Sequence, residues 1–387
     1  MTTDASPLFV LVAGEASGDL LGADLIETLR ERFPNARFAG VAGPKMIAAG
    51  MHAWQPSEKL SVMGFVEVIK HLPTLFGVKR DVIERTLAEK PAAFIGIDAP
   101  DFNLRIEREL KDAGVRTIHY VSPSIWAWRE KRADKIGSSA DRVLCLFPME
   151  PPIYARHNVD AKFVGHPLAQ QFAMEPDRSA ARRELGMTDE TPVLALLPGS
   201  RLGEIGRLAR IFFDAAATLR QEIPHLIIVV PAANASCRRA IESIATEFPT
   251  LEVRIVDGQA RTAMIASDAV LLASGTAALE AMLAKRPMVV AYRINALTHW
   301  IVKKFGILPT NVYSLPNILA GKIVVPELMQ NDCTAPALAA ALLPMLRERC
   351  IDPELFATFR RLHESLLAPR GSAAAAVAEL IAADPAR

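Results

Sequence analysis

The sequence of 387 residues has few of the features that would assign a protein to a class at once. It has only four cysteines and no C-x-x-C pair, which excludes a disulfide framework and the usual spacing of a structural zinc site. No apolar run reaches the roughly 20 residues of a membrane-spanning helix, and residues 1–7 are too polar for a signal peptide. We therefore expect a cytoplasmic protein that is soluble or lies on a membrane surface.

Charge and ligand motifs are equally sparse. The formal net charge is only +1, so no broad positive field points to nucleic acid. The chain contains neither the G-x-G-x-x-G dinucleotide fingerprint nor the G-x-x-x-x-G-K-[ST] phosphate loop. Asp-x-Asp and H-x-x-x-H are also missing. We therefore expect a site without a metal ion and without a resident cofactor.

Short apolar runs alternate with helix-favouring segments along most of the chain. This alternation predicts parallel, doubly wound α/β sheets, and the length predicts two domains. The rhythm breaks at Gly165-His166-Pro167, which suggests a first domain over residues 1–165 and a second over 166–345. Strands are predicted at 8–13, 36–41, 92–97, 116–121, 142–147, 161–164, 193–197, 226–230, 252–256, 269–272 and 288–292, and the main helices at 20–32, 105–113, 179–185, 277–285 and 372–383.

The chain is organised around the strand, turn and helix of residues 270–285. The small turn Ser274-Gly275-Thr276 leaves backbone N–H groups free at a helix N-terminus, where a phosphate can bind. Glu280 follows Thr276 by about one helical turn, so its carboxylate could accept hydrogen bonds from ribose hydroxyls. The alternative is an ordinary turn of a parallel sheet with a solvated glutamate.

Two other strand ends carry candidate binding groups. Pro198-Gly199-Ser200-Arg201 places a guanidinium, suited to a diphosphate, beside a helix N-terminus. The segment 14–19 has two glycines that allow a ligand close to the backbone, and its Ser17 hydroxyl could bind a phosphate or a sugar. A plain surface arginine and a plain tight turn remain the alternatives.

Asp98 follows a buried strand and is the candidate general base. Asp101 or Asn103 is expected to cap a helix that begins near Leu104, with Asp101 the second candidate for the base. His119 is a further alternative because its ordinary pKa lies nearer neutrality. Weaker candidates are Glu15 and Asp19.

Two stretches are unusually apolar or aromatic for a surface. Residues 65–76 carry apolar side chains at helical spacing, bordered by Lys70, Lys79 and Arg80. This pattern fits an interfacial helix or an acyl-chain groove, or else a core helix. Residues 122–129 (SPSIWAWR) place two tryptophans beside basic residues, which suits an anionic, amphiphilic partner or a core cluster.

Taken in order, these motifs resemble the lipid-A-disaccharide synthase family, a group of bacterial inverting glycosyltransferases. The matching blocks are residues 14–19, 96–103 (GIDAPDFN), 122–129, 164–167, 196–201 (LLPGSR), 273–280 (ASGTAALE), 288–293 and 314–321 (SLPNILAG). The resemblance implies a GT-B architecture, two Rossmann-like domains facing a cleft, with helices of residues 346–387 returning to the first domain. It also implies a UDP site made by Arg201, Ser274, Gly275, Thr276, Glu280 and Asn317, and Asp98 as the catalytic residue.

The resemblance further implies the substrates. The donor would be UDP-2,3-diacylglucosamine and the acceptor 2,3-diacylglucosamine 1-phosphate, and the products a β-1,6-linked disaccharide 1-phosphate and UDP. It implies peripheral attachment to the cytoplasmic face of the inner membrane. Another GT-B transferase, a UDP-sugar epimerase and a non-catalytic lipid-binding protein remain alternatives, and the sequence leaves open whether the chain forms a homodimer.

Overall fold

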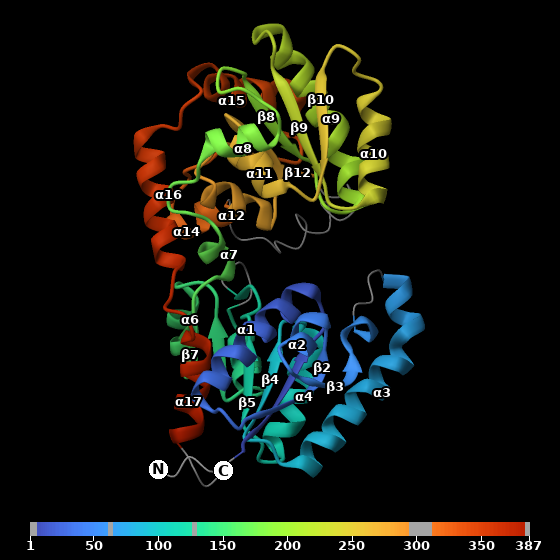
Figure 1. Cartoon of the computed structure of the whole chain (residues 1–387), viewed down its shortest axis with the longest axis vertical. Helices are drawn as coiled ribbons and strands as arrows, with labels where there is room; N and C mark the ends of the chain where they lie inside the picture. The colour runs from blue at the N-terminus through green and yellow to red at the C-terminus, as the bar shows by residue number, and fades with distance from the viewer. Residues whose placement is uncertain (1–5, 61–64, 126–129, 294–311, 384–387) are drawn as a thin grey trace. The chain divides into compact units, whose positions relative to one another are not determined.

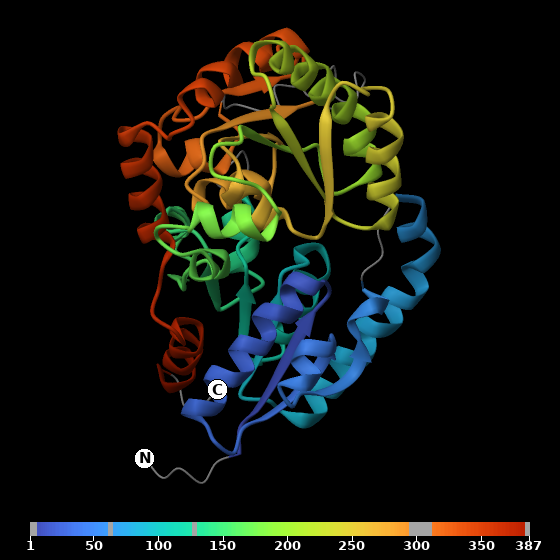
Figure 2. The same ribbon diagram turned by 45° about the horizontal axis from the view of Figure 1, so that its top comes forward.

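The computed structural model describes residues 6–60, 65–125, 130–293 and 312–383, with backbone alone for 65–72. The chain forms two compact units, the first comprising Met1–Pro167 and Leu366–Arg387 and the second Leu168–Ser365. Each unit is a parallel sheet with helices on both faces (Figures 1 and 2). The α/β class expected from the alternation of strands and helices is confirmed.

The sheet of the first unit has the order β3-β2-β1-β4-β5-β6-β7, and all its strand pairs are parallel. Its strands are β1 (Leu8–Ala13), β2 (Arg37–Ala42), β3 (His52–Pro56), β4 (Ala93–Ile97), β5 (Thr117–Tyr120), β6 (Arg142–Cys145) and β7 (Ala161–Phe163). Its helices are α1 (Ala16–Arg32), α2 (Pro44–Ala48), α3 (Phe65–Glu89), α4 (Pro100–Asp112), α5 (Arg132–Gly137), α6 (Glu150–Arg156) and α17 (Ser372–Ala383).

Strand β1 shows why this sheet is covered on both sides. All six of its residues are buried, as expected for a continuous apolar run in a parallel sheet. Phe9 and Leu11 pack in a cluster with α1, α2 and α17, whereas Val10 and Val12 pack with α3 and α4. Alternate side chains of one strand therefore anchor the helices of both layers.

The last helix completes the first unit. Ala373, Ala374 and Val377 of α17 are buried in the same cluster as β1 and α1. The Arg142 side chain of β6 donates a hydrogen bond of 2.6 Å to the carbonyl of Ala376. The C-terminal segment is thus part of the first unit, although the whole second unit precedes it in the chain.

The sheet of the second unit has the order β10-β9-β8-β11-β12-β13 and is also parallel. Its strands are β8 (Val193–Leu197), β9 (Ile227–Ala232), β10 (Glu252–Asp257), β11 (Ala269–Ala273), β12 (Met288–Tyr292) and β13 (Glu327–Met329). Its helices are α8 (Arg178–Glu184), α9 (Leu202–Glu222), α10 (Ala235–Ala245), α11 (Ala260–Ala266), α12 (Thr276–Leu283), α14 (Leu315–Ala320) and α15 (Ala335–Glu348); α7 (Pro167–Gln171) and α16 (Pro353–Leu366) lie at its two junctions with the first unit.

Helix α4 differs from the sequence expectation at its start. It begins at Pro100, with Ala99 as its N-cap, and not near Leu104. Proline suits the first helical position because its missing N–H needs no partner there. The expected cap at Asp101 or Asn103 is therefore wrong, since both residues lie inside the helix.

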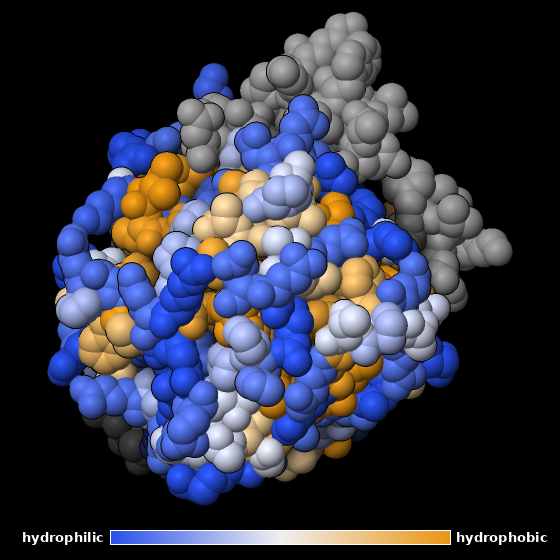
Figure 3. All heavy atoms as spheres, turned by 90° about the horizontal axis from the view of Figure 1, so that it is seen from above, coloured by the Kyte–Doolittle hydropathy of each residue, from blue (hydrophilic) through white to orange (hydrophobic). Residues whose placement is uncertain are grey.

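On the face shown in Figure 3, hydrophilic side chains separate the apolar patches, as is usual for a globular protein. Within the described ranges, no helix is both long and apolar enough to cross a membrane.

Candidate active site

The turn after β11 is open on its outer side. Gly275 has a φ of +157°, and a Cβ added there would meet no atom within 4 Å. Gly275 and Thr276 are exposed, while the Ser274 N–H is bonded to the carbonyl of Ala291 at 3.0 Å. The exposed start of α12 can therefore receive a ligand oxygen, and the turn itself is held to the neighbouring strand.

Glu280 is partly buried on α12, one turn after Thr276. Burial raises the pKa of its carboxyl above 4.5, and the positive charge of Arg261 on α11 opposes that rise. Arg261 is itself held by the carbonyl and side chain of Gln171. No described side chain or backbone N–H donates a hydrogen bond to the Glu280 carboxylate, so both its oxygens are available to hydroxyl donors.

The loop before α9 already binds a carboxylate of the protein itself, that of Glu204. Gly199 has a φ of +135°, and a Cβ there would lie 2.4 Å from the Cβ of Glu204. The Glu204 carboxylate accepts a hydrogen bond of 3.0 Å from the Ser200 N–H, so it occupies the donor expected for a phosphate. The Arg201 side chain is exposed. Because Leu197 of β8 pairs beside Leu272 of β11, Arg201 and the turn 274–276 follow adjacent strands.

Asn317 differs from the other residues expected to contact UDP. Its side chain is fully buried on α14. The amide donates to the Val325 carbonyl and the Glu327 carboxylate at 2.9 and 2.7 Å, and its oxygen accepts from the N–H groups of Val324 and Val325. With its donors and acceptors used inside the protein, Asn317 fixes the shape of the loop that follows α14.

Residues with a strained backbone lie at the carboxyl ends of two neighbouring strands of the first sheet, β4 and β5. Asp98 and Ala99 after β4, and Val121 after β5, have φ values of +53°, +45° and +81°. Left-handed conformations cost of order 1–3 kcal/mol for such residues and concentrate at functional sites. The Asp98 N–H is bonded to the Tyr120 carbonyl at 2.8 Å, which ties the two strained turns together.

The side chain of Asn103 fixes the Asp98 turn through a hydrogen bond to the Asp98 carbonyl. Its side chain is fully buried, and its amide lies 2.8 Å from the Asp98 carbonyl and 3.3 Å from the carbonyls of Val12 and Ile97. The amide therefore joins the ends of β1 and β4 beneath the partly buried Asp98. This contact was missed in the sequence because Asn103 was expected to cap the helix.

Two further buried polar side chains lie on the same side of β4 as Asn103. Glu107 of α4 and His119 of β5 are both fully buried, with Oε1 and Nδ1 2.8 Å apart. Burial raises the pKa of Glu107, and His119 opposes that rise. A Cβ at Gly96 would lie 2.1 Å from the Glu107 carboxylate, so this position has room only for glycine. His119 is fully buried, whereas Asp98 is only partly buried, so the structure favours Asp98 over His119 as the base.

The remaining candidates of the first unit fall into two groups. Asp19 is buried and caps α2 by accepting hydrogen bonds from the Lys45 and Met46 N–H groups at 2.9 and 3.0 Å. Ser17 and Glu15 are exposed where α1 begins, beside Asp98, because Ala13 of β1 pairs with Ile97 of β4. Asp101 is exposed in the first turn of α4.

Several expectations lie partly or wholly outside the described residues. Trp126, Trp128 and Arg129 are among residues 126–129, and the side chains of 65–72 are likewise not described. In the part of the chain that is described, no group of three or more His, Cys, Asp or Glu side chains could hold a metal ion.

Comparison with known proteins decides the family. The sequence model described as lipid-A-disaccharide synthetase matches residues 9–369. A lipid-A-disaccharide synthase of Xanthomonas campestris is 55% identical over 97% of this chain and 86% of its own length. One of Xylella fastidiosa is 52% identical over 97% and 98%. The chain belongs to the lipid-A-disaccharide synthase family. As a member it is a glycosyltransferase of lipid A disaccharide synthesis that uses a UDP-sugar donor and an acceptor.

Solved structures agree on the fold alone. A putative UDP-N-acetylglucosamine 2-epimerase from Listeria monocytogenes aligns over 99% of this chain and 98% of its own, with a TM-score of 0.64 and 12% identity. The glycotransferase of kitacinnamycin aligns over 97% and 98%, with a TM-score of 0.60 and 16% identity. The expected GT-B architecture is thereby confirmed.

Proposed function

We propose that the chain transfers diacylglucosamine from UDP-2,3-diacylglucosamine to the 6-hydroxyl of 2,3-diacylglucosamine 1-phosphate with inversion. The second unit would bind the donor and the first the acceptor, as expected for regions 166–345 and 1–165. The observation that supports this most is the open turn at Gly275 together with the Glu280 carboxylate, about one turn further on, which accepts no hydrogen bond from a described residue. A nucleoside diphosphate offers phosphate oxygens, which suit the exposed helix N-terminus, and a pair of ribose hydroxyls, which can donate to the carboxylate.

In the donor site, Ser274, Gly275 and Thr276 would receive the diphosphate at the start of α12, and Arg201 would offset its charge. Glu280 would accept the ribose hydroxyls. Asn317 would act as a positioning residue, because its side chain is already fully bonded within the protein.

In the acceptor site, Asp98 would take the proton of the attacking hydroxyl as its oxygen bonds to the anomeric carbon. UDP would leave from the opposite face of the sugar with the bonding electrons, and Arg201 and the α12 N-terminus would stabilise its negative charge. Ser17, exposed beside Asp98, would bind the acceptor sugar or its phosphate. This chemistry needs no metal ion and no cofactor.

We also assign the first half of α3 to a membrane surface or to the acyl chains. Phe76 is 57% exposed on this helix, and Arg80, about one turn later, has a side chain that is 80% exposed. Apolar and basic side chains on one helix suit the boundary between acyl chains and anionic headgroups. The location would be the cytoplasmic face of the inner membrane.

The test measures UDP release from UDP-2,3-diacylglucosamine with and without the acceptor, each in the presence and absence of EDTA. Release that requires the acceptor and persists in EDTA is expected. Release without acceptor, or accumulation of an epimerised UDP-sugar, would favour an epimerase or a hydrolase. Loss of activity in EDTA with recovery on adding magnesium or manganese would contradict the metal-independent mechanism.

A further inference from the structure

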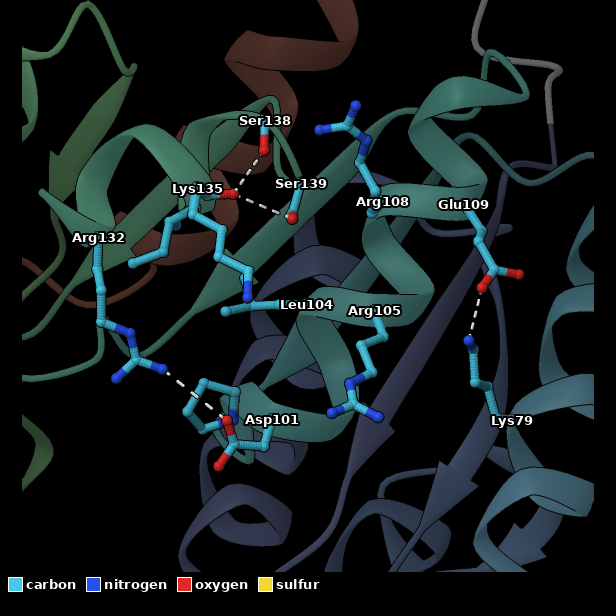
Figure 4. Close-up of a pocket in the computed structure, with 12 residues that line it drawn as sticks. Lys79, Asp101, Leu104, Arg105, Arg108, Glu109, Arg132, Lys135, Ser138 and Ser139 are labelled. Carbon is cyan, nitrogen blue, oxygen red and sulfur yellow. Dashed lines mark hydrogen bonds and ion pairs between the residues drawn. The ribbon is translucent and has the colours of Figure 1, made fainter.

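A basic pocket lies on the outer side of α4, between α3 and α5, and has a volume of about 440 Å³ (Figure 4). This volume is within the range of small-molecule sites. The charged side chains that line it are the basic Lys79, Arg105, Arg108, Arg132 and Lys135 and the acidic Asp101 and Glu109. The lining thus carries a formal charge of +3, although the whole chain carries only +1.

Two of the five cations are paired with carboxylates at hydrogen-bonding distance. The Lys79 ammonium lies 2.5 Å from the Glu109 carboxylate, across the gap between α3 and α4. The Arg108 guanidinium lies 2.9 Å from Asp112, one turn further along α4. These pairs form the end of the pocket that lies away from the start of α4, so the cations at that end already have carboxylate partners.

The other three cations have weak carboxylate partners or none among the described residues, so they are available to a ligand. Arg132 lies 3.8 Å from an Asp101 side chain that is 97% exposed, and ion pairs of this kind are weak in water. The side chains of Arg105 and Lys135 pair with no carboxylate among the described residues. Figure 4 shows the Arg132 side chain of α5 directed toward Asp101 of α4. Arg105 lies on α4, the same helix as Asp101. The excess charge is therefore concentrated toward the start of α4.

We infer that this end of the pocket binds the phosphate of the acceptor sugar, an inference that rests on the proposed function. A phosphate monoester carries about −1.5 to −2 charges at neutral pH and can pair with more than one cation. Guanidinium groups bind phosphate oxygens through paired N–H donors, and lysine adds a point charge. Arg105, Lys135 and Arg132 supply this combination.

The position of the pocket favours the acceptor over a phospholipid of the membrane. Pro100 and Asp101 line it and follow Asp98 by two and three residues. Arg105 lies one helical turn after Asp101, about 6 Å further along α4. In the acceptor, the reacting hydroxyl and the phosphate belong to the same sugar ring, so a site needs a base and a cationic group a short distance apart. The Asp98 turn leads directly into α4, whose first residues line the pocket and whose Arg105 is one of its cations.

The experiment compares the acceptor with its dephosphorylated form in detergent micelles. For the variant Arg105→Ala/Lys135→Ala, kcat/KM with the phosphorylated acceptor is expected to fall at least about tenfold, as expected for the loss of charged hydrogen bonds. With the dephosphorylated acceptor it should not change, and KM for the donor and UDP affinity should stay at wild-type values. The matched control is Arg37→Ala/Arg239→Ala, which removes two exposed arginines outside the pocket.

Three results would overturn the inference. The variant could keep the wild-type preference for the phosphorylated acceptor, or it could lose activity equally on both acceptors. It could also lose binding to vesicles of anionic phospholipid while its acceptor preference stays unchanged, which would assign the pocket to the bilayer. A failure of the proposed function would be distinct, because wild-type UDP release would then not depend on the acceptor.

Discussion

At the scale of single residues, Asp98 connects backbone strain with chemistry. Its φ of +53° belongs to the left-handed region, which asparagine and aspartate tolerate better than other residues with a Cβ. Asp98→Asn should therefore preserve the turn while removing the basic carboxylate. We expect turnover to fall by about 10²–10⁴-fold, with UDP affinity near that of the wild type, measured by single-turnover kinetics and calorimetry.

Asp101→Asn tests the second candidate for the base, since Asp101 is exposed in the first turn of the helix that follows. It should retain turnover. If Asp98→Asn were to keep its turnover and Asp101→Asn were to lose it, the role of the base would pass to Asp101.

Glu280 and Arg201 should govern nucleotide affinity. Burial raises the pKa of Glu280, so its carboxylate takes up a proton at a higher pH than an exposed glutamate does. Because the ionised form is the better acceptor for ribose hydroxyls, UDP affinity should fall as the pH drops through this raised pKa. Glu280→Gln should lose this pH dependence. At neutral pH, Glu280→Gln and Arg201→Ala should each weaken UDP binding, by about 1.5–3 kcal/mol for a charged hydrogen bond.

Calorimetry with UDP across this pH range provides the measurement. Glu242→Gln, which alters an exposed glutamate of α10 in the same unit, should titrate like the wild type. Unchanged UDP affinity in both folded variants, Glu280→Gln and Arg201→Ala, would remove these residues from the donor site.

The sequence indicates some site residues and conceals others. Asp98 and Arg201 could be singled out because each follows a predicted strand by a short turn, and Glu280 because it lies one helical turn beyond such a turn. Asn103 and His119 could be noticed only as a helix cap and an alternative base, and Glu107 not at all, because a polar residue on a helix normally indicates a solvated surface. Only the folded chain reveals that Asn103 faces back toward the ends of β1 and β4.

At the scale of elements, α3 should carry the membrane contact. Replacing Val68, Ile69, Leu72 and Leu75 with serine should move the protein from the membrane fraction to the soluble fraction, because each large apolar side chain contributes roughly 1.5–3 kcal/mol when buried. Fractionation of cell lysates measures the shift.

Leu87→Ser provides the control for α3, since Leu87 is 41% exposed near the other end of the same helix. It should leave the distribution unchanged. Unfolding or aggregation of the fourfold serine variant would instead show that the segment belongs to the core.

The sequence predicted the bounds of a helix or strand well where the residues of that segment alone carry a clear pattern. The ranges 193–197, 288–292 and 372–383 agree with β8, β12 and α17. The short strands β3 and β13 were missed because five and three residues carry too little pattern, and both pair at the edges of their sheets. The start of α4 was missed because the preceding left-handed residues depend on the packing around them.

At the scale of the whole molecule, the second unit interrupts the first. The chain leaves the first unit after Pro167 and returns to it at Leu366. A sequence pattern can locate the alternation of strands and helices, but it does not show that residues 366–387 pack against β6 and α1. That connection depends on contacts such as the one between Arg142 and Ala376, which are 234 residues apart.

This order of segments has a consequence for biosynthesis. The second unit is continuous, so it can fold as soon as Ser365 has left the ribosome. The first unit must wait for α17, and translation of the intervening residues takes roughly 10–40 seconds at ordinary elongation rates. During that time the apolar surfaces of β1 and α1 that Ala374 and Val377 later cover stay exposed on the nascent chain. The unit that is made first is therefore the last to be completed, and we expect it to depend more on chaperones during synthesis than the second unit does.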